Sequence, residues 1–231
     1  MVKKWIVFPI IISIIVIGTG LSNPQYNGLL LKDSYLYKNI EIQSMELIKD
    51  IIVIPEDRFN EVEVREIIDR IAALPTVILQ DMKQKGMKVI LFTGKLTDNP
   101  SAAHLEGIVP RGYPPDIVWD DLPGIGGSKL ILIKIGHSEQ GEGHGSINLE
   151  YHEIAHSIYN YMQNDSIMAD ITLAWEQEAK ALFPEQSYFL NYKEEYFAES
   201  FALYFISKEN RMKLKQLAPD TYASLSDYIN R

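Results

Sequence analysis

The chain has 231 residues, of which 46% are hydrophobic, and this is enough to bury a sizeable core in one domain. Its formal net charge is −9, so we expect neither nucleic acid nor an anionic membrane surface as a partner. The sequence has no cysteine, which excludes disulfides and lipoprotein attachment through a cysteine.

The N-terminus has the pattern of a secretory signal peptide. Lys3 and Lys4 precede an apolar run over 5–17, and small residues follow up to Ser22. The run is shorter than the roughly 20 residues of a membrane-spanning helix, and Pro9 interrupts it. We expect residues 1–22 to be removed on export and the protein to be secreted by a Gram-positive-type bacterium. An uncleaved N-terminal anchor is the alternative, and it would be the only contact with a membrane.

Regular elements are readable over most of the remaining chain. Residues 23–45 show no clear period, and we interpret them as a linker or an arm before a folded domain over 46–231. Periodicity and breaker residues predict strands over 51–54, 88–92 and 130–135, and helices over 60–74, 75–85, 147–162, 166–182 and 185–207.

The long stretch 93–128 is rich in glycine and proline and lies between two predicted strands. Connections of this length in a domain are usually functional loops or disordered ones. Tyr113 and Trp119 favour an ordered loop that packs on something, because large aromatic side chains are costly to leave in water. Gly124, Gly126 and Gly127 precede a strand, so we expect them to allow a close backbone approach or a turn and not to bind a nucleotide.

The predicted helix over 147–162, with Ser146 as its expected N-cap, contains the pattern His152-Glu153-Ile154-Ala155-His156. Positions i and i+4 lie on one face of a helix, so the two imidazoles point the same way. Two imidazole nitrogens about 2.0–2.1 Å from one ion are half of a tetrahedral zinc site. Glu153 can then reach a water molecule on that ion as a general base. The alternative is two surface histidines beside a solvated carboxylate.

A third metal ligand is expected on the helix over 185–207. Glu195 and Glu199 border its apolar aromatic face, where a carboxylate is unusual unless it is paired or bound to a metal. Two histidines and one glutamate, with a position left for water, are the ligand set of a catalytic zinc. Spacing leaves both glutamates open as the third ligand, and a buried salt bridge is the structural alternative.

Several further stretches accompany these two motifs, and together they are more specific than the zinc pattern alone. They are Gly94–Asp98, Trp119–Asp121, Pro123–Ser128, Ile147–Glu150, and Glu194–Glu195 ahead of Phe197–Phe201. With them, the chain from about Ile51 to the C-terminus resembles the catalytic domain of the anthrax lethal factor family. Within that family it resembles the small secreted Pro-Pro endopeptidases of Gram-positive bacteria.

The resemblance implies an α+β fold of the zincin-like type, with a small mixed sheet, an active-site helix and a mainly helical C-terminal lobe. It implies one Zn²⁺ per chain, held by His152, His156 and Glu199, with Glu153 as the base. It also implies that Tyr192, seven residues before the third ligand, stabilises the oxyanion. Glu195 would then lie in the second shell of the metal.

The resemblance further implies an extended proline-rich peptide as substrate, cleaved between two prolines. We expect Arg111, Tyr113, Trp119, Gly127 and Ser128 to bind it. The chain departs from the family pattern here, because Tyr113 stands where a tryptophan is expected and the loop is about one residue shorter. We expect the peptide to add as a strand beside residues 129–135.

Two alternatives remain open at this point. One is a lethal-factor-like protease with a different specificity, and the other is a non-catalytic secreted binding module with a structural zinc. Intact Glu153 and Tyr192 favour an enzyme, because a structural zinc needs neither. We expect a monomer, with His104, His137 and His144 as surface or loop residues.

Overall fold

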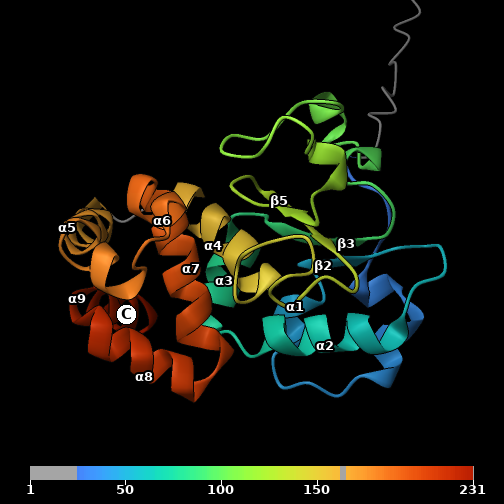
Figure 1. Ribbon diagram of the computed structural model, residues 1–231. Helices are drawn as coiled ribbons and strands as arrows, with labels where there is room; N and C mark the ends of the chain where they lie inside the picture. Colours follow the sequence, from blue (N-terminus) through green and yellow to red (C-terminus); the bar gives the residue numbers. More distant parts are fainter. Residues whose placement is uncertain (1–24, 162–164, 231) are drawn as a thin grey trace, which may run out of the picture.

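The computed structural model describes residues 25–161 and 165–230 (Figure 1). The predicted signal peptide therefore lies outside the described residues. Within the described ranges, no helix combines the length and the apolar character needed to cross a membrane. The predicted α+β class is confirmed: a small mixed sheet is combined with a mainly helical C-terminal half.

The sheet has the strand order β1-β2-β3-β5-β4. Its three central strands are parallel to one another, whereas the edge strands β1 and β4 are antiparallel to their neighbours. The central strands are continuous apolar runs because both of their faces are covered. The strands are β1 (Leu29–Leu30), β2 (Ile52–Ile54), β3 (Lys88–Phe92), β4 (Gly124–Ile125) and β5 (Leu130–Lys134).

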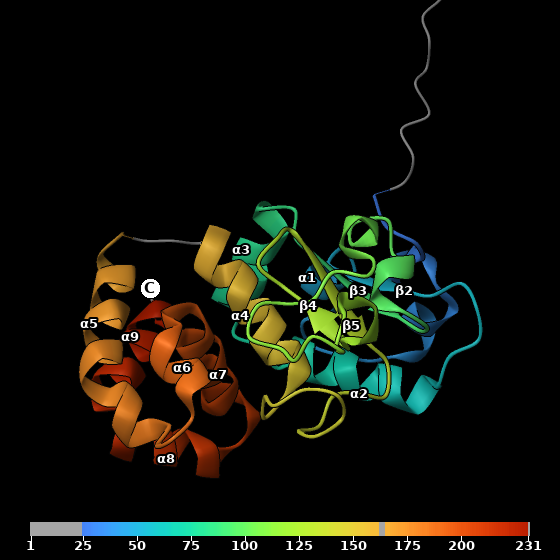
Figure 2. The same cartoon turned by 45° about the horizontal axis from the view of Figure 1, so that its top comes forward.

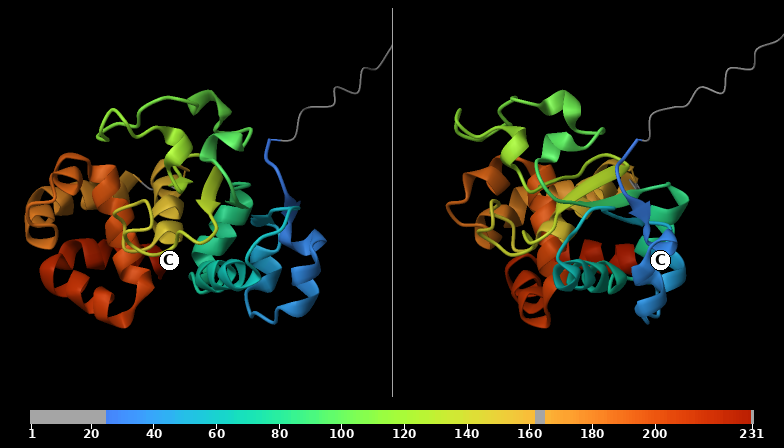
Figure 3. Two further views of the ribbon diagram at one scale, coloured as in Figure 1. Left: turned by 45° about the vertical axis from the view of Figure 1, so that its right-hand side comes forward. Right: turned by 90° about the vertical axis from the view of Figure 1, so that its right-hand side faces the viewer.

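Helices flank the sheet and form the second half of the molecule. The helix that carries the histidine motif, α4, lies between the sheet and the C-terminal helices (Figures 1 and 2). The helices before it are α1 (Met45–Ile48), α2 (Glu61–Ala72) and α3 (Thr76–Gln84), and α4 itself spans Leu149–Tyr161. The C-terminal helices are α5 (Asp165–Leu182), α6 (Ser187–Asn191), α7 (Lys193–Ile206), α8 (Lys208–Leu217) and α9 (Pro219–Ile229). In the left view of Figure 3 these two halves lie side by side.

The segment interpreted from sequence as a linker or arm is part of the fold from Leu29 onward. Its two-residue strand β1 pairs with β2, and short 3-10 helices follow over 31–39. Leu31 and Leu36 are fully buried in the main core. The segment is therefore an arm packed into the core and not a linker, and elements this short show no periodicity in a sequence.

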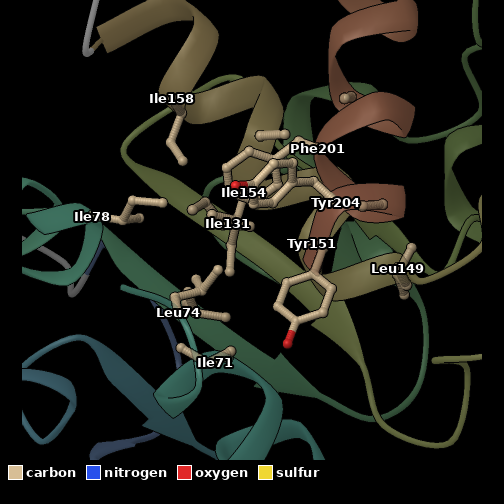
Figure 4. Close-up of a cluster of buried hydrophobic side chains, with 14 of the residues drawn as sticks. Ile71, Leu74, Ile78, Ile131, Leu149, Tyr151, Ile154, Ile158, Phe201 and Tyr204 are labelled. Carbon is tan, nitrogen blue, oxygen red and sulfur yellow. The ribbon is translucent and has the colours of Figure 1, made fainter. Parts of the chain in front are cut away.

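The main core joins the sheet, α4 and α7. Ile131 of β5 lies near Ile154 and Ile158 of α4, and Phe201 of α7 packs on the same cluster (Figure 4). Since α4 contacts both β5 and α7, its position is fixed from two sides. The histidine motif is therefore carried by one of the best-anchored helices of the fold.

The N-cap of α4 is Asn148, and the prediction of Ser146 was wrong by two residues. The Asn148 side-chain oxygen accepts a hydrogen bond from the backbone N–H of Tyr151 at 3.0 Å, which is the contact an N-cap makes. Ser146 instead orders the turn before the helix, where its hydroxyl donates to the carbonyl of Asn148.

A buried polar cluster holds the start of α4. The carboxylate of Glu150 is fully buried and accepts hydrogen bonds from Asn148 Nδ2 at 2.6 Å and from the Ser138 hydroxyl. Arg70 of α2 neutralises it, with Nη2 at 2.9 Å, and the Tyr151 hydroxyl donates to the carbonyl of Arg70. We call Arg70, Ser138, Asn148 and Glu150 the anchor cluster. It ties α2, the loop over 136–148 and α4 together.

Replacing Arg70 with Met should destabilise the protein by about 3 kcal/mol, because the Glu150 carboxylate would remain buried without its cation. Arg65→Met on the same helix is the matched control. Its ion pair with Glu61 is exposed and 3.8 Å long, so its loss should cost less than about 1 kcal/mol. Urea unfolding of both variants measures the difference. Equal losses of unfolding free energy in the two variants would show that the buried ion pair of the anchor cluster stabilises the protein no more than the exposed pair does.

Candidate active site

Three ligand atoms from two helices meet at one point. His152 and His156 of α4 place their Nε2 atoms 3.1 Å apart. Glu195, in the first turn of α7, places Oε2 at 3.2 Å from the first of these nitrogens and 3.3 Å from the second. This is the one group among the described residues whose side chains are arranged to hold a metal ion.

The separations within this group fit a tetrahedral zinc. Ligands about 2.0–2.1 Å from one tetrahedral ion lie about 3.3–3.4 Å from one another. The three observed distances are close to this value, and two nitrogens with one oxygen form a donor set that zinc accepts. His152, His156 and Glu195 therefore fit zinc in both chemistry and spacing.

Glu199 does not belong to this group, so the structure does not support it as the third ligand. Its Oε2 lies 3.1 Å from His152 Nδ1, the ring nitrogen on the far side from Glu195. Its Oε1 accepts the backbone N–H of Ile147 at 2.9 Å. A carboxylate in this position orients a metal-binding imidazole and fixes its tautomer. Glu195, and not Glu199, therefore completes the group that could hold a metal ion.

The charges of this site are strongly coupled. Burial favours the neutral imidazole of His152, but hydrogen bonds to Glu195 and Glu199 outweigh it and raise the pKa of His152 to about 10. Burial likewise opposes ionisation of Glu195, and its contacts with His152 and His156 nevertheless hold the pKa of this carboxyl well below its usual range. Without a metal the carboxylates thus hold a proton on the imidazole, and metal binding must displace it.

A cavity of about 800 Å³ opens over the group and is lined by residues from four parts of the chain. Glu153 lies in its wall beside both histidines. Four of the predicted substrate-binding residues also line it: Arg111, Tyr113, Trp119 and Gly127. Ser128 is not part of the lining among the described residues. Its hydroxyl is held by both backbone groups of Leu130.

Tyr188 occupies the place in the cavity that was predicted for Tyr192. The Tyr188 ring lines the cavity, and its hydroxyl donates to Glu195 Oε1 at 2.8 Å. Tyr192 lies outside the described lining, with the Arg111 guanidinium 4.0 Å above its ring. Tyr188 precedes Glu195 by seven residues, the spacing expected between the tyrosine and the third ligand. The same spacing, counted back from Glu195 and not from Glu199, would have indicated Tyr188 from the sequence alone.

Burial raises the pKa of Tyr188, and the neighbouring Glu195 carboxylate acts in the same direction. The hydroxyl therefore remains protonated at neutral pH, and its one proton is directed at Glu195 Oε1 in this structure. Arg111 pairs with Glu194 at 2.7 Å, so the loop over the cavity is tied to the first turn of α7. This tie holds the Tyr113 loop near the metal group.

The sheet edge at the cavity is β4, and the prediction of strand addition beside residues 129–135 was wrong. β5 is paired on both sides, with β3 and with β4, so β4 presents the outer edge. β4 and the glycines after it lie against α4: a Cβ on Gly126 would be 2.0 Å from the carbonyl oxygen of Glu153. The glycines thus permit the close approach that was expected of them.

His144 is a loop residue, as expected, and it also lines the cavity. Its Nε2 lies 2.9 Å from the carbonyl oxygen of His137. Burial lowers the pKa of His144, so the ring is neutral at pH 7. No periodic signal marks this residue, because it lies in a loop between glycines.

The family model described as anthrax toxin lethal factor, N- and C-terminal domain, matches residues 39–230. The chain belongs to this family, and its fold and site make it a zincin-like metalloendopeptidase.

The chain is also similar to two curated proteins named Pro-Pro endopeptidase. The one from Clostridioides difficile (strain 630) is 38% identical over 187 residues, which are 80% of this chain and 84% of the relative. The one from Paenibacillus alvei is 35% identical over 182 residues, or 78% and 83%. A solved structure of the Pro-Pro endopeptidase PPEP-2 from Paenibacillus alvei matches with a TM-score of 0.73 and 33% identity, covering 78% of this chain and 98% of that one.

Zinc affinity should distinguish the two glutamates. Glu195→Gln removes a ligand and should abolish stable zinc binding, whereas Glu199→Gln should weaken it only about 10- to 100-fold through the orientation of His152. Competition with a chromophoric chelator measures both affinities. The opposite ranking would restore Glu199 as the ligand.

Proposed function

We propose that this protein is a zinc endopeptidase that cleaves proline-rich proteins between two prolines. The observation that carries the proposal is the group of His152, His156 and Glu195, with Glu153 beside it in the wall of a cavity. The Pro-Pro specificity is supported by the names of the relatives and by the aromatic cavity lining.

In the proposed mechanism, His152, His156 and Glu195 would hold the zinc. A bound zinc would act as a Lewis acid and lower the pKa of the water molecule that attacks the peptide bond. Glu153 takes the proton from the attacking water and delivers it to the proline nitrogen that leaves. Glu199 keeps Nδ1 of His152 protonated, so that Nε2 remains free to bind. The Tyr188 hydroxyl turns from Glu195 Oε1 and donates its hydrogen bond to the oxyanion that forms on the scissile carbonyl.

Substrate recognition must rely mainly on shape. Proline has no backbone N–H, so a Pro-Pro segment forms few hydrogen bonds with the edge of β4. The rings of Tyr113 and Trp119, together with Ile125 of β4, offer apolar surface in compensation. Tyr113 is 37% exposed, so part of its ring is available for contact with prolyl rings.

We further propose that the protein acts outside the cell as a monomer. The support for secretion is the charge and apolar pattern of residues 1–22. A proline-rich cell-surface or extracellular protein would then be the substrate.

Digestion of a mixed peptide library, read by mass spectrometry, tests the function. Residues 23–231 loaded with zinc should cut between adjacent prolines, and a chelator should stop the reaction. Glu153→Gln is the matched control: it should bind zinc and leave every peptide intact, because it has no base. Cuts at other bonds would keep the metalloendopeptidase and refute the Pro-Pro specificity.

The two tyrosines can be separated by removal of a single hydroxyl. Tyr188→Phe should lower kcat by about 10²- to 10³-fold, the usual effect of losing an oxyanion donor. Tyr192→Phe keeps the ring beneath Arg111 and should change kcat little. Steady-state kinetics on one Pro-Pro peptide compares them. A large loss in the Tyr192 variant alone would reverse the assignment.

A further inference from the structure

His144 has one ring nitrogen in use and one without a partner. The carbonyl oxygen of His137 can only accept, so Nε2 of His144 must carry the proton that bridges their 2.9 Å separation. In a neutral imidazole, Nδ1 is then an acceptor with a free lone pair.

This acceptor is unusual within the described structure. Three buried side-chain polar atoms there have no hydrogen-bond partner: Ser101 Oγ, His144 Nδ1 and Ser200 Oγ. Of these three residues, His144 alone lines the cavity. Buried polar groups are normally satisfied, and an exception calls for an explanation.

The anchor cluster holds the loop that carries His144. Ser138 and Asn148, near the two ends of this loop, both bind the buried Glu150 carboxylate. An isolated bridge between Glu139 and Asn148 pairs the two ends directly. The base of the loop is therefore fixed, whereas its tip has glycines at 141, 143 and 145.

The position of His144 along the cavity follows from its neighbours. A Cβ on Gly143 would lie 3.6 Å from the ring of Pro123, the residue just before β4. Gly127, at the other end of β4, lies near Asn160 instead. A peptide along the edge of β4 would therefore pass His144 at the Pro123 end.

We propose that Nδ1 of His144 accepts a hydrogen bond from a main-chain N–H of the substrate, supplied by a residue that flanks the proline pair. This inference rests on the proposed function. The two prolines have no N–H to donate, so a single acceptor fixes which flanking residue lies at the Pro123 end and thereby sets the register of the scissile bond. Solvent does not reach Nδ1 in the free protein, so the ring must turn slightly when substrate binds.

Two substitutions separate the two nitrogens of the ring. His144→Asn keeps an acceptor near the position of Nδ1 and loses the Nε2 donor, whereas His144→Gln keeps a donor near Nε2 and loses the acceptor. We expect the Gln variant to lose about threefold to tenfold in kcat/KM on a Pro-Pro peptide, mainly through KM, and the Asn variant to lose less. Zinc content and Tm, measured on the same zinc-loaded proteins, should stay close to wild type in the Gln variant.

N-methylation of the peptide identifies the donor. Each non-proline amide near the Pro-Pro bond is methylated in turn and tested on wild type and His144→Gln. At one position the methyl group should cost the wild type the same factor as the substitution and cost the variant nothing more. Three outcomes would each overturn the proposal. The Gln variant could show wild-type kinetics, its loss of activity could follow its zinc content or Tm, or no methylated position could be coupled to the substitution. If the wild type cuts only other bonds, the proposed Pro-Pro function fails, and the same cycle on the cleaved peptide still tests His144.

Discussion

The site depends on one electrostatic constraint at the contact between α4 and α7. Glu195 and Glu199 are both buried, and the imidazole of His152 lies between them. Buried carboxylates are costly unless cations or hydrogen bonds compensate them, so this helix pair needs positive charge at its centre. The raised pKa of His152 puts a proton there in the free protein, and a zinc ion bound to the same group would supply more positive charge together with reactivity. Stability and catalysis thus place the same demand on these residues.

The rest of the fold holds α4 so that this constraint can be met. The anchor cluster fixes the start of the helix against α2, and the core around Ile154 and Phe201 fixes its middle. On the opposite side, Gly126 lets the chain after β4 approach the backbone of Glu153. The cavity therefore lies between a rigid helix and a sheet edge, and the loop that carries Arg111 and Tyr113 lies over it.

Much of the fold could be predicted from sequence, because periodicity marks long elements. β3 was predicted with its observed bounds, and α2, α4 and β5 were predicted to within a few residues. The histidine pair was readable because a spacing of four fixes a helical face. β1 and the 3-10 helices over 31–39 were missed because they are too short to have a period. The position of His144 in the cavity lining was missed because it depends on a loop that folds back to the cavity.

The error in the third ligand has a geometric cause. Glu195 and Glu199 are one helical turn apart, so they lie on the same face of α7 and periodicity cannot separate them. What distinguishes them is the position of α7 along its own axis relative to α4. In the observed position, Glu195 lies in the first turn of α7 and contacts the Nε2 atoms of both histidines. The helix dipole also favours a carboxylate in this first turn. Glu199, one turn deeper, reaches Nδ1 of His152. A shift of α7 by one turn would bring Glu199 towards the two Nε2 atoms and leave Nδ1 of His152 without its acceptor. The packing of these two helices therefore decides which glutamate faces which ring nitrogen of His152.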